Sequence, residues 1–211
     1  MLRELFASVV MMVLLMPGCM ESSMMNESSE STESSIPFEI TFNASTLDRV
    51  EDQGADFSLK DDLSDGPVML LWIGAGCSGC QDWTDMIREQ IDNGELDQTN
   101  ISFVSVHRWS DFETRENVEE AFGSNSTSSH YTPWKVVLPT SSTLALDFST
   151  EQNTDHSLYA AYGNPGTPTL QLVAQNGVVA WESKTYWADE SVLEDGLTFF
   201  SSQVNTQAVE E

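Results

Sequence analysis

Residues 68–92 read VMLLWIGAGCSGCQDWTDMIREQID. The first part, residues 68–73, is a continuous apolar run of strand length, which is typical of a strand buried on both faces. A glycine-rich turn with Cys77 and Cys80 follows. The apolar residues after it recur at the three- and four-residue spacing of an amphipathic helix: Trp83, Met86, Ile87 and Ile91. Since residues 93–94 are Asn-Gly, a typical stop signal, the stretch predicts a strand, a turn and a helix.

A second apolar run at residues 101–106 predicts another strand. Because a helix separates the two strands, they are expected to lie parallel in a βαβ unit. Asn176-Gly177 predicts a hairpin between a strand at 169–173 and a returning strand at 178–181. The expected fold class is therefore α/β, with a central mixed sheet flanked by helices. Further elements are predicted at residues 116–122 (helix), 134–138 (strand), 155–162 (short helix) and 192–204 (closing helix).

Cys77 and Cys80 are separated by two residues, so they can close a small disulfide or share a metal ion. Their place between a strand and a helix favours redox chemistry, because the N–H groups and the dipole of a helix N-terminus stabilise a thiolate. Cys77 is then the expected nucleophile, and Cys80 is the thiol that resolves a mixed disulfide. A purely structural disulfide is the alternative, although a bridge that closes so short a loop contributes little stability.

No metal site and no cofactor are predicted. Tetrahedral zinc sites draw on a second Cys pair or on clustered His residues. The three His residues, at positions 107, 130 and 156, are scattered along the chain. They are expected to be ordinary surface or packed residues.

Two motifs together resemble the thioredoxin superfamily. The first covers residues 57–86, where a Phe-x-Leu, Asp-Leu, Gly-Pro-Val lead-in precedes the apolar strand, Cys-Ser-Gly-Cys and the helix. This lead-in is similar to that of membrane-tethered, TlpA-like thiol-disulfide oxidoreductases. The second motif, Gly166-Thr167-Pro168-Thr169, resembles the cis-proline loop of the same superfamily. The resemblance implies a thioredoxin-like fold, catalytic Cys77 and Cys80, a cis bond before Pro168, and contact of Thr167 and Pro168 with substrate.

Three positions depart from the pattern of that family. Gly76 replaces the usual aromatic residue before the first Cys, which predicts a more open approach and an altered substrate-binding surface. Asp85 stands where a helix-kinking proline is usual, and Leu71 stands where thioredoxins carry a buried acid. The sequence offers no evident substitute for that acid.

A short polar segment follows the second predicted strand. His107, Arg108 and Trp109 should emerge at the same edge of the sheet as the Cys turn, because the carboxyl ends of parallel strands meet there. They are expected to be ordinary loop residues of that edge, and a position bordering the site is the alternative.

The N-terminal residues predict export and anchoring. Residues 1–18 contain Arg3 and then an apolar run at 5–16, which suits a signal peptide better than a membrane span of about 20 residues. Met-Pro-Gly-Cys at residues 16–19 resembles the lipoprotein signal-peptidase box, which implies lipidation of Cys19; an ordinary secretory signal is the alternative. Residues 19–36 are rich in Ser and Glu and predict a disordered tether to a single domain at 37–211.

The charge of the chain limits its partners. It has 34 Asp and Glu against 8 Lys and Arg, a formal net charge of -26, so phosphate backbones are repelled and nucleic-acid binding is not expected. We expect a thiol-disulfide oxidoreductase of the protein-disulfide reductase type, lipid-anchored at the extracytoplasmic face of the cell membrane. Its expected partners are exported proteins that carry thiols or disulfides, with cytochrome c maturation as the family analogy. If the protein reduces them, a membrane reductant transporter has to supply the electrons.

Three other functions fit part of the sequence. A peroxiredoxin-type peroxidase shares the fold, but Gly74 stands where that family has Thr. A thioredoxin-like copper chaperone needs two Cys and a distant His, for which His130 and His156 are candidates, but such proteins separate their Cys residues by three positions. A non-catalytic module that only holds a partner is the third.

Overall fold

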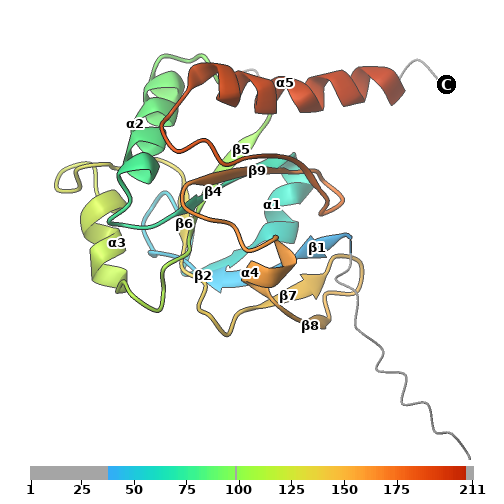
Figure 1. The fold of residues 1–211 in the computed structure, drawn as a ribbon, viewed down its shortest axis with the longest axis horizontal. Coiled ribbons are helices and arrows are strands. Elements are labelled where there is room, and N and C mark those ends of the chain that lie inside the picture. Colours follow the sequence, from blue (N-terminus) through green and yellow to red (C-terminus); the bar gives the residue numbers. More distant parts are fainter. Residues whose placement is uncertain (1–37, 98, 208–211) are drawn as a thin grey trace, which may run out of the picture. The chain divides into compact units, whose positions relative to one another are not determined.

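The centre of the protein is a five-stranded mixed sheet with the strand order β10-β9-β4-β5-β6 (Figure 1). A computed structural model describes residues 38–97 and 99–207. The predicted signal peptide, Cys19 and the tether lie outside the described residues. In chain order the elements are β1 (Ile40–Thr41), β2 (Asn43–Ser45), β3 (Asp56–Ser58), α1 (Leu59–Asp65), β4 (Val68–Ile73), α2 (Ser78–Asp92), β5 (Ser102–His107), α3 (Arg115–Phe122), β6 (Lys135–Val137), β7 (Leu144–Asp147), β8 (Asn153–Ser157), α4 (Leu158–Ala161), β9 (Thr169–Val173), β10 (Val179–Ser183) and α5 (Glu190–Gln207).

The strand pairing confirms the predicted βαβ unit and hairpin. β4 and β5 are parallel, with Val68 opposite Ser102, and β5 and β6 are parallel as well. β9 runs antiparallel to β4, and β10 runs antiparallel to β9 across the Asn-Gly turn. Gly177 in this turn has a φ of 82°, a conformation that glycine adopts without strain. The predicted α/β class with a mixed sheet is confirmed.

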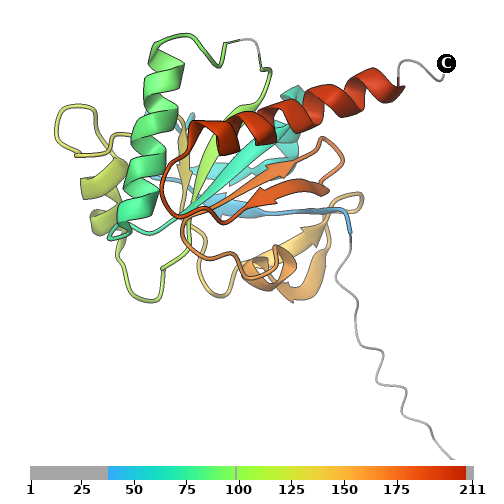
Figure 2. The same cartoon turned by 45° about the horizontal axis from the view of Figure 1, so that its top comes forward.

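β4 is buried on both faces because its side chains alternate between two hydrophobic clusters. Met69, Leu71 and Ile73 pack in one cluster with residues of α2, α3 and α5. The intervening residues of β4 pack in the other cluster with residues of β1, α1 and α4. Figure 2 shows α2 and α5 on the same side of the sheet. This double burial explains why the strand is apolar at every position.

The structure differs from the prediction at residues 155–162. Residues 153–157 form strand β8, which pairs antiparallel with β7, and only Leu158–Ala161 are helical. Ser157 caps this helix, since its side chain accepts a hydrogen bond from the N–H of Ala160. The predicted helix was therefore too long, because its first residues are polar and pair better as an edge strand than they pack as a helix.

Several short elements were not predicted. β1, β7 and β8 make a separate three-stranded sheet, and β2 pairs with β3. Helix α1 begins after Ser58, whose side chain accepts a hydrogen bond from the N–H of Asp61. Within residues 38–97 and 99–207, no helix is both long enough and apolar enough to cross a membrane.

Candidate active site

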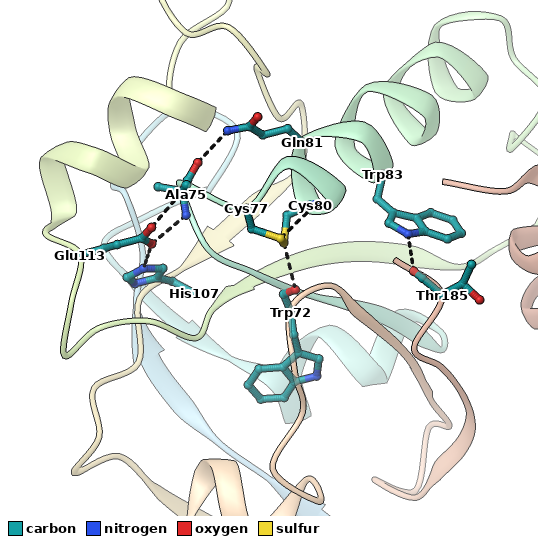
Figure 3. The surroundings of a disulfide bond; sticks show 10 residues. Trp72, Ala75, Cys77, Cys80, Gln81, Trp83, His107, Glu113 and Thr185 are labelled. Carbon is teal, nitrogen blue, oxygen red and sulfur yellow. Dashed lines mark hydrogen bonds and ion pairs between the residues drawn. A yellow bond between two sulfur atoms is a disulfide. The ribbon is translucent and has the colours of Figure 1, made fainter. Parts of the chain in front are cut away.

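Cys77 and Cys80 form a disulfide at the N-terminus of α2 (Figure 3). Their Cα atoms are 5.2 Å apart. Cys77 is the N-cap residue, and the N–H of Cys80 donates to the Cys77 Sγ at 3.2 Å. Cys77 is 3% exposed and Cys80 is fully buried, while the residues on either side of Cys77, Gly76 and Ser78, are exposed. A partner sulfur can therefore approach Cys77 more directly than Cys80.

The second motif lies beside the first in the sheet. The bond between Thr167 and Pro168 is cis, as the resemblance predicted. Thr169 begins β9 and pairs with Trp72 of β4, one residue before that strand ends. The cis-proline loop thus flanks the strand end from which the Cys turn departs. Thr167 is half-buried and Pro168 is buried; their contact with substrate stays a prediction, as does that of Gly76.

Glu113 is a site residue that the sequence analysis missed. Its Oε2 accepts a hydrogen bond from the N–H of Ala75 at 2.7 Å, and its Oε1 accepts one from the N–H of Gly76 at 2.8 Å. The Nε2 of His107 lies 2.9 Å from the same Oε2. Figure 3 shows this carboxylate between the His107 ring and the turn before Cys77. The turn that Gly76 was expected to open is held by a side chain from the loop between β5 and α3.

His107 itself is buried at the end of β5, with 4% of its side chain exposed. Burial lowers the pKa of His107 below its usual value, although the hydrogen bond and the charge of Glu113 act in the opposite direction. The imidazole is then neutral at neutral pH. Because a carboxylate can only accept, Nε2 must carry the proton that His107 shares with Glu113.

Trp109 contacts the start of the Cys turn, and Arg108 contacts the residue before the cis-proline motif. A Cβ at Gly74 would lie 2.6 Å from the Trp109 ring, so the ring packs directly on the start of the Cys turn. The Nε of Arg108 donates to the carbonyl of Pro165 at 3.3 Å, and its guanidinium lies 4.0 Å from the centre of the Tyr159 ring. Residues 107–109 border the site; the expectation that they are ordinary loop residues was wrong.

The other two positions that depart from the family pattern, Leu71 and Asp85, take part in packing and in contacts between elements. Leu71 is fully buried in the core. Asp85 lies in an uninterrupted α2, forms an ion pair with Arg88 (2.8 Å) and is hydrogen-bonded to the Nδ1 of His130 (2.7 Å). In place of a proline, α2 therefore carries a side chain that is bonded to the loop after α3.

The loop between β10 and α5 packs on the first two turns of α2. The Nε1 of Trp83 donates to the carbonyl of Thr185 at 2.9 Å, and the N–H of Ala188 donates to Asp82 at 2.9 Å. Tyr186 and Trp187 of this loop are 46% and 59% exposed. Gly79 faces the backbone of Tyr186 so closely that no side chain fits between them.

An open pocket of about 460 Å³ adjoins the Cys turn, with Gly76, Gln81, Glu113, Glu120 and His130 among its lining residues. His130 thus lies near the turn, but its Nδ1 is engaged by Asp85. Within the described residues, no three His, Cys, Asp or Glu side chains form a group that could hold a metal ion.

Comparison with known proteins places the fold. No family model matches the chain, and neither does any curated protein. The fold is similar to MTB DsbF in its mixed oxidised and reduced forms (TM-score 0.50, 18% identity, 78% of this chain and 98% of that chain). It is also similar to a thiol:disulfide interchange protein of the thioredoxin family from Chlorobium tepidum TLS (TM-score 0.50, 14% identity, 79% and 97%).

A third similar structure is the mitochondrial 2-Cys peroxiredoxin of Plasmodium falciparum (TM-score 0.54, 11% identity, 83% of this chain and 97% of that chain). At such identities the similarity shows the fold alone, and the fold is thioredoxin-like. Since proteins of different activities share it, the reaction has to be argued from the site.

Proposed function

We propose that this protein is an extracytoplasmic thiol-disulfide oxidoreductase that exchanges the Cys77–Cys80 dithiol/disulfide with exported proteins. The observation that carries the proposal is the disulfide at the N-cap of α2. The N–H of Cys80 already points at the Cys77 sulfur, and it can stabilise negative charge there after reduction. The adjacent cis-proline loop supports the same function.

The exchange follows the usual two-step chemistry of thiols. A partner thiolate attacks the Cys77 Sγ, the bond between Cys77 and Cys80 breaks, and Cys80 leaves with the electron pair and takes up a proton. A second partner thiolate then attacks the partner sulfur of the mixed disulfide and releases Cys77. Two electrons pass from the partner dithiol to the protein; Cys80 takes up one proton, Cys77 stays a thiolate, and the second proton goes to the solvent. Reduction of a partner disulfide runs the same steps backwards. The Cys80 Sγ lies 3.9 Å from the carbonyl oxygen of Trp72, to which the buried thiol can donate.

The place of action is part of the proposal and is supported by the sequence. A signal peptide at 1–18, lipidation of Cys19 and a tether at 19–36 would hold the domain at the extracytoplasmic membrane face. A protein that reduces there depends on a membrane reductant transporter, and cytochrome c maturation is one process that needs such a reductant. Incorporation of labelled fatty acid into the wild-type chain, but not into a Cys19→Ser variant, tests the anchor.

A redox titration of the full-length protein tests the chemistry. Thiol labelling of Cys77 and Cys80 in defined thiol buffers should give a reversible two-electron couple, below about -220 mV for a reductase and near -120 mV for an oxidant. Cys80→Ser should accumulate a mixed disulfide on Cys77, and the matched Cys77→Ser variant should not. A pair that reacts only in the unfolded protein is structural, which would leave the interaction module as the function.

A further inference from the structure

The turn that presents Cys77 takes its shape from a carboxylate. The N–H groups of Ala75 and Gly76 both donate to Glu113, one to each oxygen, and Glu113 directly precedes the N-cap of α3. Thr114 and Asn117 form a capping box at that helix end, which fixes the backbone beside Glu113. His107 holds the carboxylate from the other side at 2.9 Å. Three hydrogen bonds therefore set the position of one charged group next to the residue that precedes Cys77.

This charge acts on the reduced protein and not on the oxidised one. A disulfide carries no charge, whereas a reduced Cys77 at a helix N-terminus forms a thiolate. Because His107 is neutral at neutral pH, it does not cancel the charge of Glu113. The side chain of Glu113 is 13% exposed, so water screens it only in part. Repulsion between Glu113 and the thiolate then destabilises the dithiol relative to the disulfide.

We propose that Glu113, held by His107, is a positioning residue that fixes the turn before Cys77 and lowers the reduction potential of the Cys77–Cys80 pair. This inference rests on the proposed function. A side chain of the loop between β5 and α3 would then control how strongly the Cys77–Cys80 pair reduces its partners. The helix N-terminus favours the thiolate, Glu113 opposes it, and the balance of the two sets the potential.

Other titratable groups near the turn do not bond its backbone. Glu120 and His130 line the same pocket, but His130 is paired with Asp85 and Glu120 is exposed. Arg108 lies over Tyr159 and binds the carbonyl of Pro165. Among the acidic side chains of the described residues, Glu113 is the one that bonds the backbone of the turn.

Glu113→Gln removes the charge and one acceptor with almost no change in shape. In the full-length protein the pH midpoint of Cys77 alkylation should fall by about one unit, as expected when a like charge nearby is removed. The equilibrium constant with glutathione should shift about tenfold toward the reduced protein, a rise in potential of about 30 mV. Glu120→Gln is the matched control, because it removes an equal charge from the same pocket without touching the turn, and it should change both quantities much less.

A measurement on the wild-type protein covers the case in which Glu113→Gln fails to fold. Gly76 is exposed, so an unbonded N–H at this position would exchange with solvent as fast as in an open loop. Amide exchange should instead show protection of the Ala75 and Gly76 N–H groups in the oxidised and the reduced protein. Fast exchange at Gly76, or an alkylation midpoint and a potential that Glu113→Gln shifts no more than Glu120→Gln, would overturn the inference. A pair that does not cycle in the wild type would instead overturn the proposed function.

Discussion

His107 is a buried base whose protonation is unfavourable in the folded protein. The free energy of unfolding should therefore depend on pH. Burial lowers the pKa of His107 below its usual value of 6.5. As the pH falls through that usual value, the unfolded chain binds a proton that the folded protein does not bind, so the free energy of unfolding decreases. The contribution is complete above the unfolded pKa and is lost on acidification until folded His107 is itself protonated.

His107→Gln keeps an N–H donor for Glu113 but does not titrate. Urea unfolding at several values between pH 5 and 7.5 should therefore give a shallower loss of stability on acidification than the wild type shows. Carboxylates such as Asp147, whose pKa is lowered by hydrogen bonds to Thr150, are present in both proteins and cancel in the difference. Parallel pH profiles for the two proteins would contradict the assignment.

Single residues also show where the sequence stops being informative. Cys77, Cys80 and Pro168 were predicted because their motifs join residue types whose chemistry is specific. Glu113 was missed because its partners are backbone N–H groups, which no sequence pattern displays. The available signal was indirect: a polar residue, His107, ends a buried strand, and a carboxylate stands next to a helix cap.

At the level of elements, α2 and the loop between β10 and α5 depend on the absence of a side chain at Gly79. A Cβ there would overlap the carbonyl oxygen of Tyr186 and lie 3.1 Å from its ring, and a backbone atom cannot move aside cheaply. Gly79→Ala should therefore lower the free energy of unfolding by about 1–3 kcal/mol, even though alanine favours a helix. Gly166→Ala is the control, because a Cβ at Gly166 meets nothing within 4 Å.

Urea unfolding of the two glycine variants at neutral pH gives the comparison. Gly166→Ala should stay within about 0.5 kcal/mol of the wild type. The Trp83 side chain takes part in the same contact, because its Nε1 donates to Thr185 of the loop that Gly79→Ala should displace. If Gly79→Ala were as stable as Gly166→Ala, the loop would not be packed on α2 in solution.

Helices and strands could be predicted where one hydrophobic pattern continues along the whole element. The strand at 68–73, the helix after it and the strand beginning near residue 101 each carry such a pattern, and all three are present. β8 reads Asn-Thr-Asp-His-Ser and has no apolar alternation, so only its pairing with β7 makes it a strand. Long-range pairing of this kind is a tertiary effect that a local pattern cannot show.

For the whole molecule, acidic residues far outnumber basic ones, and the basic residues that the structure describes are already bonded to other groups. Seven of the eight Lys and Arg residues are described, and each has a partner. Five form ion pairs: Arg49, Lys60, Arg88, Lys135 and Lys184. Arg108 binds the carbonyl of Pro165, and Arg115 binds the carbonyls of Thr46 and Leu47. The field around the disulfide is therefore expected to be negative and to attract cationic partners.

This field should affect the rates at which the protein exchanges thiols with small disulfides, and it should affect positively and negatively charged disulfides in opposite directions. Reduced protein should react faster with cystamine, a dication, than with dithiodiglycolate, a dianion, after each rate is normalised to that of free mercaptoethanol. Raising the salt from 0.1 M to 1 M shortens the screening length from about 10 Å to about 3 Å, so the ratio of the two rates should fall severalfold. A ratio that salt leaves unchanged would mean that contacts at the site, and not the charge of the molecule, select the partner.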